Sequence, residues 1–211
     1  MIKSTLAFAP VQGRAAEAIK DITEFRDMFL ECGANQAIAY SVASGQGFGN
    51  LQLRVFTDSN QHIREVSEKL QATDLFNQWN SNPSPSSVRL GVLRTEDVAF
   101  SGDREAVQSG KTKSMTTIGT IAKPGKIVEL EERLEGWTDV WVESGATACQ
   151  ASRAVTGLPN DRYFLNILME HSGELDGILE NMRQTAAWTA LATNTDPSSE
   201  IVSNVLLNRL P

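Results

Sequence analysis

Arg54 is the residue of this sequence best suited to binding a charged ligand. It lies in the run Leu51 to Thr57, where aliphatic residues alternate with other types, so a strand here places its leucines on one face and Arg54 on the other. A guanidinium offers paired N–H donors to a carboxylate, phosphate or enolate oxygen. A buried arginine also needs an anionic partner. The run therefore predicts that Arg54 anchors the negative group of a ligand.

The same face of the neighbouring predicted strands carries further aromatic and hydrogen-bonding side chains. These strands span residues 36–43, 147–155 and 162–169. Together with the strand of Arg54, they supply the residues that we expect to contact a ligand: Tyr40, Gln52, Arg54, Phe56, Gln150, Ser152, Phe164 and Asn166. Aromatic groups with a few polar ones are typical of a small-molecule pocket. The alternative is a filled core in which these polar groups satisfy one another.

The sequence lacks the residues that other kinds of catalytic centre need. A zinc or two-metal site needs clustered His, Cys or carboxylate ligands. The only histidines, His62 and His171, each lie near the start of a predicted helix, at non-equivalent positions. A Ser, Thr or Cys nucleophile needs a base within hydrogen-bond reach, and no motif of that kind occurs. The sequence therefore predicts no metal site and no nucleophilic triad.

Composition and charge argue against several partners. The chain of 211 residues is 41% hydrophobic and carries a net charge of −7, which disfavours nucleic acid and anionic membranes because both attract a positive field. The apolar run at the N-terminus is too short for a signal peptide, and no stretch of about 18 apolar residues suggests a membrane span. Cys32 and Cys149 do not occupy matching positions. Reduced thiols in a cytoplasmic protein are therefore expected.

The elements that position these residues occur twice. The run Glu31-Cys32-Gly33-Ala34 returns 112 positions later as Glu143-Ser144-Gly145-Ala146. In each copy an amphipathic helix ends at the glycine, which can adopt the left-handed conformation of a C-terminal cap, and two strands joined by a loop follow. The apolar stripe of that helix repeats at the same offset. Chance repetition does not produce matching helices and caps in one register, so the chain is a tandem duplication.

Each copy is predicted to have the order β-α-β-β-α-β, the ferredoxin-like split βαβ arrangement. Helices cover only one face of such a sheet, so the other face must be covered as well. The two antiparallel sheets are therefore expected to pack face to face as an α/β barrel of the α+β class, with the helices outside. We assign residues 1–96 to repeat 1, 97–114 to a polar linker with a short helical turn around 104–108, and 115–211 to repeat 2. The fourth strand of repeat 1 is expected at 88–92.

The second helix of each copy carries a resemblance to a known family. In residues 59–79 a long helix ends in the run Leu70-Gln71-Ala72-Thr73-Asp74-Leu75-Phe76-Asn77-Gln78-Trp79, and Met182 to Trp188 follows the same pattern. With the doubled topology, the sequence resembles the dimeric α/β-barrel superfamily in a tandem-fused form. Members of that superfamily include cofactor-free oxygenases, haem enzymes and isomerases. Haem-binding relatives use a histidine as axial ligand, but a histidine at a helix start is typically solvated or capping, so no cofactor is expected.

Three functions remain open at this level. The first is binding of a small, partly apolar and anionic molecule between the two sheets. The second, which the resemblance implies, is a cofactor-free monooxygenase or isomerase that holds an enolate-like substrate with Tyr40, Arg54 and Asn166. The third is an assembly protein with a filled barrel. A homodimer is compatible with all three.

Overall fold

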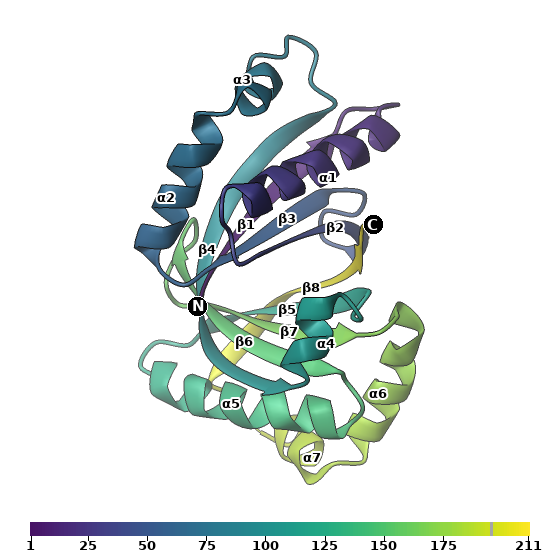
Figure 1. The fold of residues 1–211 in the computed structure, drawn as a ribbon. Coiled ribbons are helices and arrows are strands. Elements are labelled where there is room, and N and C mark those ends of the chain that lie inside the picture. The colour runs from purple at the N-terminus through teal and green to yellow at the C-terminus, as the bar shows by residue number, and fades with distance from the viewer. Residues whose placement is uncertain (195) are drawn as a thin grey trace.

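The computed structural model describes residues 1–194 and 196–211 (Figure 1). The first copy consists of β1 (Ile2–Pro10), α1 (Ala15–Glu31), β2 (Gln36–Gly45), β3 (Leu51–Thr57), α2 (Asn60–Gln71), α3 (Asp74–Asn80) and β4 (Ser87–Gly102). A short helix, α4 (Arg104–Ser109), connects the copies. The second copy consists of β5 (Ser114–Ala122), α5 (Ile127–Glu143), β6 (Ala148–Thr156), β7 (Arg162–Met169), the 3-10 turn η1 (Ser172–Glu174), α6 (Leu175–Arg183), α7 (Ala186–Ala192) and β8 (Ser199–Arg209). Across the described residues, every helix is too short or too polar to span a membrane.

The duplication is visible in the bounds of the elements. The strands β1 and β5 begin at Ile2 and Ser114, and the helices α1 and α5 begin at Ala15 and Ile127, so both pairs are offset by 112 residues. The chain turns after α1 and α5 at glycines with φ of 102° and 116°, which are Gly33 and Gly145. A positive φ is the conformation predicted for these caps, and it is one that residues with a Cβ rarely adopt.

The eight strands form one closed barrel. Their order around it is β1-β3-β2-β8-β5-β7-β6-β4. Each copy contributes a four-stranded sheet of the ferredoxin-like order β4-β1-β3-β2, or β8-β5-β7-β6, and the sheets join where β2 pairs with β8 and β4 pairs with β6. The order repeats after four strands in the same direction, so the pseudo-twofold axis of the duplication coincides with the barrel axis. The helices of the two copies lie on opposite outer sides of the barrel (Figure 1), and the predicted fold is confirmed.

The fourth strand of the first copy differs from the sequence prediction. Strand β4 continues past Val92 to Gly102, and its second half pairs with β6 from Arg94 opposite Thr156 to Gly102 opposite Ala148. Residues 97–102, which composition places in a linker, therefore belong to the barrel. Their backbone groups are satisfied by a strand of the other copy, a long-range pairing that local sequence does not signal. The predicted helical turn near 104–108 is α4.

The second helix of each copy is divided in two, which the helical periodicity did not predict. In the first copy α2 ends at Gln71 and α3 begins at Asp74. The Thr73 hydroxyl accepts a hydrogen bond from the Phe76 backbone N–H at 3.2 Å. In the second copy Thr185 caps α7 in the same way. A threonine at this position satisfies a free N–H of the new helix, which favours a break over a continuous helix.

The apolar residues are divided between the outer and inner faces of the barrel. In β3, Leu51, Leu53 and Val55 are buried against α1 and α2, as the alternation predicted. A separate apolar cluster lies inside the barrel and includes Ile38, Tyr40, Met115, Leu168 and Leu207. Because successive strand residues point to opposite faces, Gln52 and Arg54 share the interior with this cluster.

Candidate functional site

Arg54 lies at the centre of the barrel interior and is 5% exposed. Its Nη1 donates a hydrogen bond to Asn166 Oδ1 at 2.9 Å and lies 3.1 Å from Met115 Sδ. Its Nη2 donates to Thr117 Oγ1 at 3.2 Å and to Gln52 Oε1 at 3.4 Å. The Nε atom is buried without a partner. Arg54 and Asn166 are equivalent positions of the two copies, so their contact marks the pseudo-twofold axis.

The positive charge of Arg54 is not balanced by a carboxylate among the described residues. Its hydrogen-bond acceptors are amides, a hydroxyl and a thioether, and its guanidinium carbon lies 5.5 Å from the centre of the Tyr40 ring. Burial lowers the pKa of Arg54 to about 10, and Tyr40 partly opposes this effect. Burying a charge without a counter-charge costs free energy. The interior is therefore electrostatically suited to an anion.

Lys3 adds a second buried cation to the same interior. This side chain is 3% exposed, and its Nζ donates a hydrogen bond to Ser152 Oγ at 3.3 Å. Burial and the nearby charge of Arg54 together lower the pKa of Lys3 to about 7, although Asp97 acts in the opposite direction. Burial raises the pKa of Asp97, which accepts a hydrogen bond from Gln150 Nε2 at 2.8 Å.

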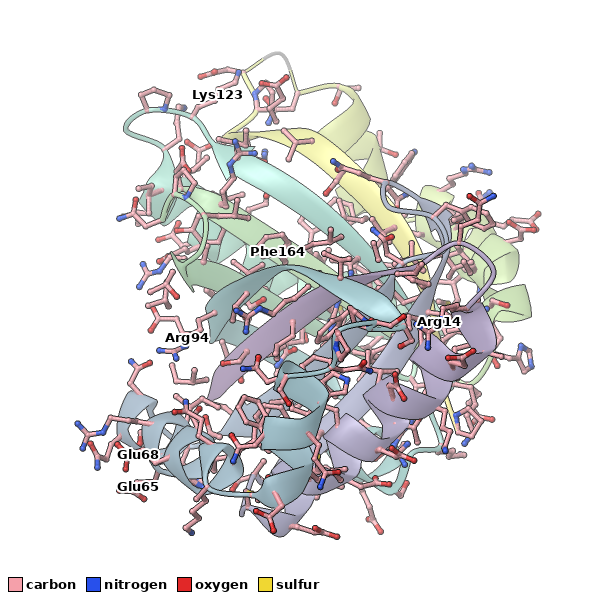
Figure 2. The ribbon with its side chains drawn as sticks, turned by 90° about the horizontal axis from the view of Figure 1, so that it is seen from above. Arg14, Glu65, Glu68, Arg94, Lys123 and Phe164 are labelled. Carbon is pink, nitrogen blue, oxygen red and sulfur yellow. The ribbon has the colours of Figure 1, made fainter. Side chains whose placement is uncertain are left out.

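Two cavities flank the guanidinium of Arg54. The larger, of about 130 Å³, is lined by polar residues such as Lys3 and Gln52 and by apolar ones such as Phe164. In Figure 2 Phe164 lies among the strands, whereas Glu65 and Glu68 lie on the outside. The smaller cavity, of about 50 Å³, is lined in part by residues of α4. An apolar cavity of about 150 Å³ holds a benzene molecule, so the larger space suits a ligand of that size.

Most of the residues that the sequence predicts to contact a ligand lie beside these cavities. The predicted residues that line one or both cavities are Tyr40, Gln52, Arg54, Phe56, Gln150, Phe164 and Asn166. Ser152 is fully buried, lines neither cavity and accepts a hydrogen bond from Lys3. The prediction missed Lys3, Thr95 and Thr117. The alternation of β1 places Lys3 on the other face of the strand from Leu6 and Phe8. The sequence therefore contained the information that Lys3 faces the barrel interior.

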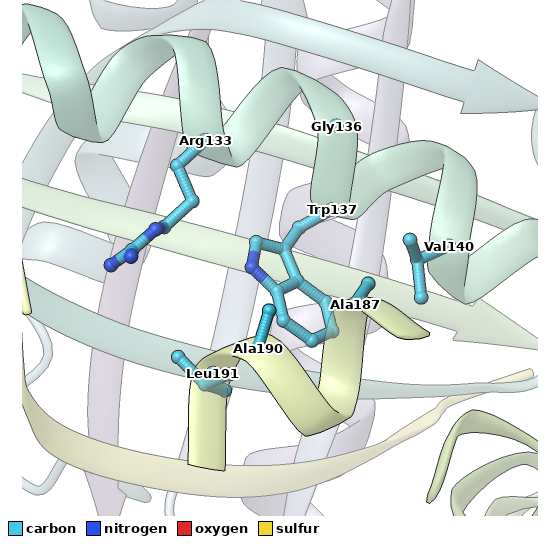
Figure 3. Close-up of a pocket in the computed structure, with 7 residues that line it drawn as sticks. All are labelled: Arg133, Gly136, Trp137, Val140, Ala187, Ala190 and Leu191. Carbon is cyan, nitrogen blue, oxygen red and sulfur yellow. The ribbon is translucent and has the colours of Figure 1, made fainter. Parts of the chain in front are cut away.

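A second, more apolar hollow lies outside the barrel, between the sheet of the second copy and its helices. A cavity of about 290 Å³ is lined by Thr120, Trp137, Trp141, Trp188 and Leu191, among others. It adjoins a groove between α5 and α7 (Figure 3), where Trp137 is directed toward Ala187, Ala190 and Leu191 and Arg133 lies beside it. Trp141 is also part of the core, as its helical spacing predicted.

The equivalent region of the first copy is packed differently. There Phe8, Phe25 and Trp79 form an aromatic cluster, with the ring centres of Phe25 and Trp79 4.9 Å apart and those of Phe8 and Trp79 6.0 Å apart. Phe8 corresponds to Thr120 and Trp79 to Leu191. The first copy retains a smaller hollow of about 170 Å³ beside Arg89 and Arg94.

Comparisons with known proteins place this geometry in a recognised fold. No protein-family model matches the chain, and no curated protein matches it either. A solved structure of a candidate monooxygenase from Fusobacterium nucleatum covers 100% of this chain and 92% of its own at 10% identity, with a TM-score of 0.64. An anthrone oxidase-like protein covers 99% and 93% at 10% identity, with a TM-score of 0.57. A chlorite dismutase variant from Candidatus Nitrospira defluvii covers 100% and 90% at 11% identity, with a TM-score of 0.53.

The chain has the dimeric α/β-barrel fold. Both halves of the barrel are present in one polypeptide, as the resemblance implied. Because the sequence identities are only 10–11%, the structural similarity to these proteins establishes the architecture alone. The chemistry of this protein must therefore be argued from its own residues.

Neither histidine of this chain fits the role of a haem ligand. The side chain of His171 is 71% exposed and lies 3.4 Å from Glu174. The Nε2 atom of His62 contacts the Gly33 carbonyl oxygen at 2.9 Å. An axial ligand needs a ring nitrogen directed into an enclosed pocket. Within the described residues, no group of three or more His, Cys, Asp or Glu side chains could hold a metal ion.

Proposed function

We propose that this protein binds a small, partly apolar, anionic molecule inside the barrel, with Arg54 as its anchor. The observation that carries the proposal is a buried guanidinium between two cavities, with an unpartnered Nε and no carboxylate among its described neighbours. A ligand carboxylate would supply the missing counter-charge and accept N–H donors.

The volume of the cavity and the difference between the two copies restrict the class of ligand further. A volume of about 130 Å³ suits a short acid with one ring or a branched chain. Phe164, Leu93 and Val205 offer apolar surface, and Gln52 and Thr117 offer hydrogen bonds. Because Asn166 replaces arginine at the equivalent position, the barrel carries its extra positive charge on one side of the axis. This difference would favour one orientation of the ligand.

The test compares an acid with its neutral counterpart. Benzoate should raise the melting temperature of the protein, and benzyl alcohol should not. Arg54→Asn, which makes the two copies alike at this position, should abolish the benzoate effect. Arg94→Asn, on the outer side of β4, is the control and should keep it. Equal stabilisation of wild type and Arg54→Asn by benzoate would refute the anchor.

A second candidate function is favoured by the cavity beneath α5 and α7. We infer that a flat aromatic molecule could occupy it, because three tryptophans line a space of about 290 Å³. Two of the structures with this fold are described as a candidate monooxygenase and an anthrone oxidase-like protein, which supports a cofactor-free oxygenase acting on such a molecule. The described lining includes Arg133 and Thr120 but no carboxylate or histidine. A proton acceptor for the reaction would therefore be solvent.

Anthrone is a suitable probe of this candidate. Oxygen uptake with anthrone should rise with protein concentration, and anthrone should quench the fluorescence of the lining tryptophans. Thr120→Phe introduces the residue that fills the equivalent space in the first copy, so it should suppress both signals. Arg54→Asn, in the other site, should leave both unchanged. Oxygen uptake that is unaffected by Thr120→Phe would exclude this cavity as the reaction site.

A further inference from the structure

We propose that Lys3 is a nucleophilic amine that forms a Schiff base with the carbonyl of a short oxo acid. The inference rests on the proposed function of the barrel, because the carboxylate of this acid would bind Arg54. It adds a covalent step and a substrate class to that site. Such an acid has a carboxylate, which would be the missing counter-charge of Arg54, and a carbonyl group within reach of the Lys3 amine.

The register of β1 and β3 brings the two cations together. Lys3 is opposite Phe56 and Thr5 is opposite Arg54 in this antiparallel pair. Lys3 and Arg54 are therefore diagonal neighbours on the inner face, a relation that separates their Cβ atoms by about 7 Å. Both line the cavity of about 130 Å³. An oxo acid, whose carbonyl is one or two bonds from its carboxylate, is short enough to contact both side chains there.

The surroundings of Lys3 favour the neutral amine that this chemistry needs. Its Nζ has a hydrogen bond to Ser152 and no ion pair within the described part of the chain. Burial and the charge of Arg54 lower the pKa of Lys3 to about 7, while Asp97 opposes the shift. A lysine that is desolvated beside another cation is an activated nucleophile. The neutral amine is therefore far more accessible at Lys3 than at an exposed lysine.

The reaction is a balanced condensation. The Nζ lone pair attacks the carbonyl carbon, and a proton passes from nitrogen to the carbonyl oxygen to give a carbinolamine. The hydroxyl group and the remaining proton on nitrogen then leave together as water, and the nitrogen lone pair forms the C=N bond, without any oxidant or cofactor. Thr95 also lines the cavity, and its Oγ1 is buried without a partner. This hydroxyl is available to hydrogen-bond the oxygen that leaves.

The second copy provides an internal comparison. The position equivalent to Lys3 is Met115, which lies against Arg54 and has no amine. One nucleophile per chain is therefore expected, despite the duplication. Lys3→Met places the side chain of one copy in the other, so it removes the amine with a residue that this barrel already accommodates.

Pyruvate and sodium borohydride test the proposal directly. Borohydride reduces a Schiff base to a stable secondary amine, so the whole protein should gain one reduced pyruvate, located on the peptide with Lys3. Lys3→Arg and Lys3→Met should both lose this adduct. Lys113→Arg, which alters an exposed lysine of the same protein, should retain it. An adduct that persists without Lys3, or that spreads over exposed lysines, would overturn the proposal.

Arg54→Asn separates this inference from the proposed function. If both hold, the variant should lose trapping by pyruvate but keep trapping of Lys3 by propanal, which has no carboxylate. Trapping of Lys3 by pyruvate that Arg54→Asn does not reduce would confirm the amine and refute the anchor. Stabilisation by benzoate without any trapping at Lys3 would refute the amine and leave the anchor standing.

Discussion

At the scale of single residues, the molecule buries two cations where a hydrophobic core would be more stable. Lys3 and Arg54 are 3% and 5% exposed and share one barrel interior. Taking a charge out of water is costly, and no carboxylate among the described residues pairs closely with either group. Groups that weaken the folded state in this way are typical of binding sites, where the ligand supplies what the protein lacks.

Lys3 should make stability depend on pH in a defined window. Its pKa is about 7 in the folded protein and 10.5 for an ordinary exposed lysine, so between these pH values the unfolded chain binds more protons. The free energy of unfolding should therefore rise with pH across the window, by up to about 1.4 kcal/mol per pH unit. Below pH 7 the lysine is charged in both states and the cost of its burial is fully present.

Melting temperatures of wild type and Lys3→Met between pH 7 and pH 9.5 measure this effect. The variant should be the more stable protein at pH 7, and it should lack the rise that wild type shows. Arg54 contributes only above its lowered pKa of about 10. Parallel curves for the two proteins would show that Lys3 is not a buried titrating group.

At the scale of elements, the same local devices end the matching helices. Gly33 and Gly145 both follow a helix with positive φ, and a Cβ at either position would meet no atom closer than 3.6 Å. The cost of a side chain there is therefore conformational and not steric. This makes the two glycines a clean test of the cap assignment.

Gly33→Ala and Gly145→Ala should each lower the free energy of unfolding by about 1 kcal/mol. Chemical denaturation measures the difference. Gly136 lies within α5, and a Cβ there would meet nothing within 4 Å. Gly136→Ala should therefore stabilise the protein, by up to about 1 kcal/mol, because alanine is the better helix former. Destabilisation by Gly136→Ala would show that packing, and not backbone conformation, controls these positions.

At the scale of the whole molecule, the two copies depend on each other. Each sheet exposes an inner face that only the other sheet covers, and β4 and β8 pair with strands of the opposite copy. The boundary that composition suggests, with repeats at 1–96 and 115–211, cuts through β4. The copies are consequently expected to unfold in one cooperative transition.

Separate expression of residues 1–113 and 114–211 tests this dependence. Each fragment alone should self-associate, because an uncovered sheet face and free strand edges are exposed. Mixing the two should restore a single species of the mass of the intact chain, as measured by size-exclusion chromatography with light scattering. A stable, soluble monomer of residues 1–113 would contradict the shared barrel.

The sequence by itself determined the duplication, the strand alternation and the set of inward-facing residues. These are local signals, because side-chain periodicity and cap residues repeat within a few positions. The leucines of β3 required one register, and that register placed Gln52 and Arg54 inside the barrel. The predicted fold and most of the cavity lining follow from this pattern.

Only the tertiary structure decided how much space remains inside the barrel and which polar side chains come into contact. The continuation of β4 to Gly102 depends on hydrogen bonds from β6. The contact of Arg54 with Asn166 joins residues 112 positions apart. The two cavities beside Arg54 and the hollow lined by three tryptophans depend on how side chains of the two copies pack. Such features are set by distances between strands and helices that are remote in the chain, and side-chain periodicity carries no information about those distances.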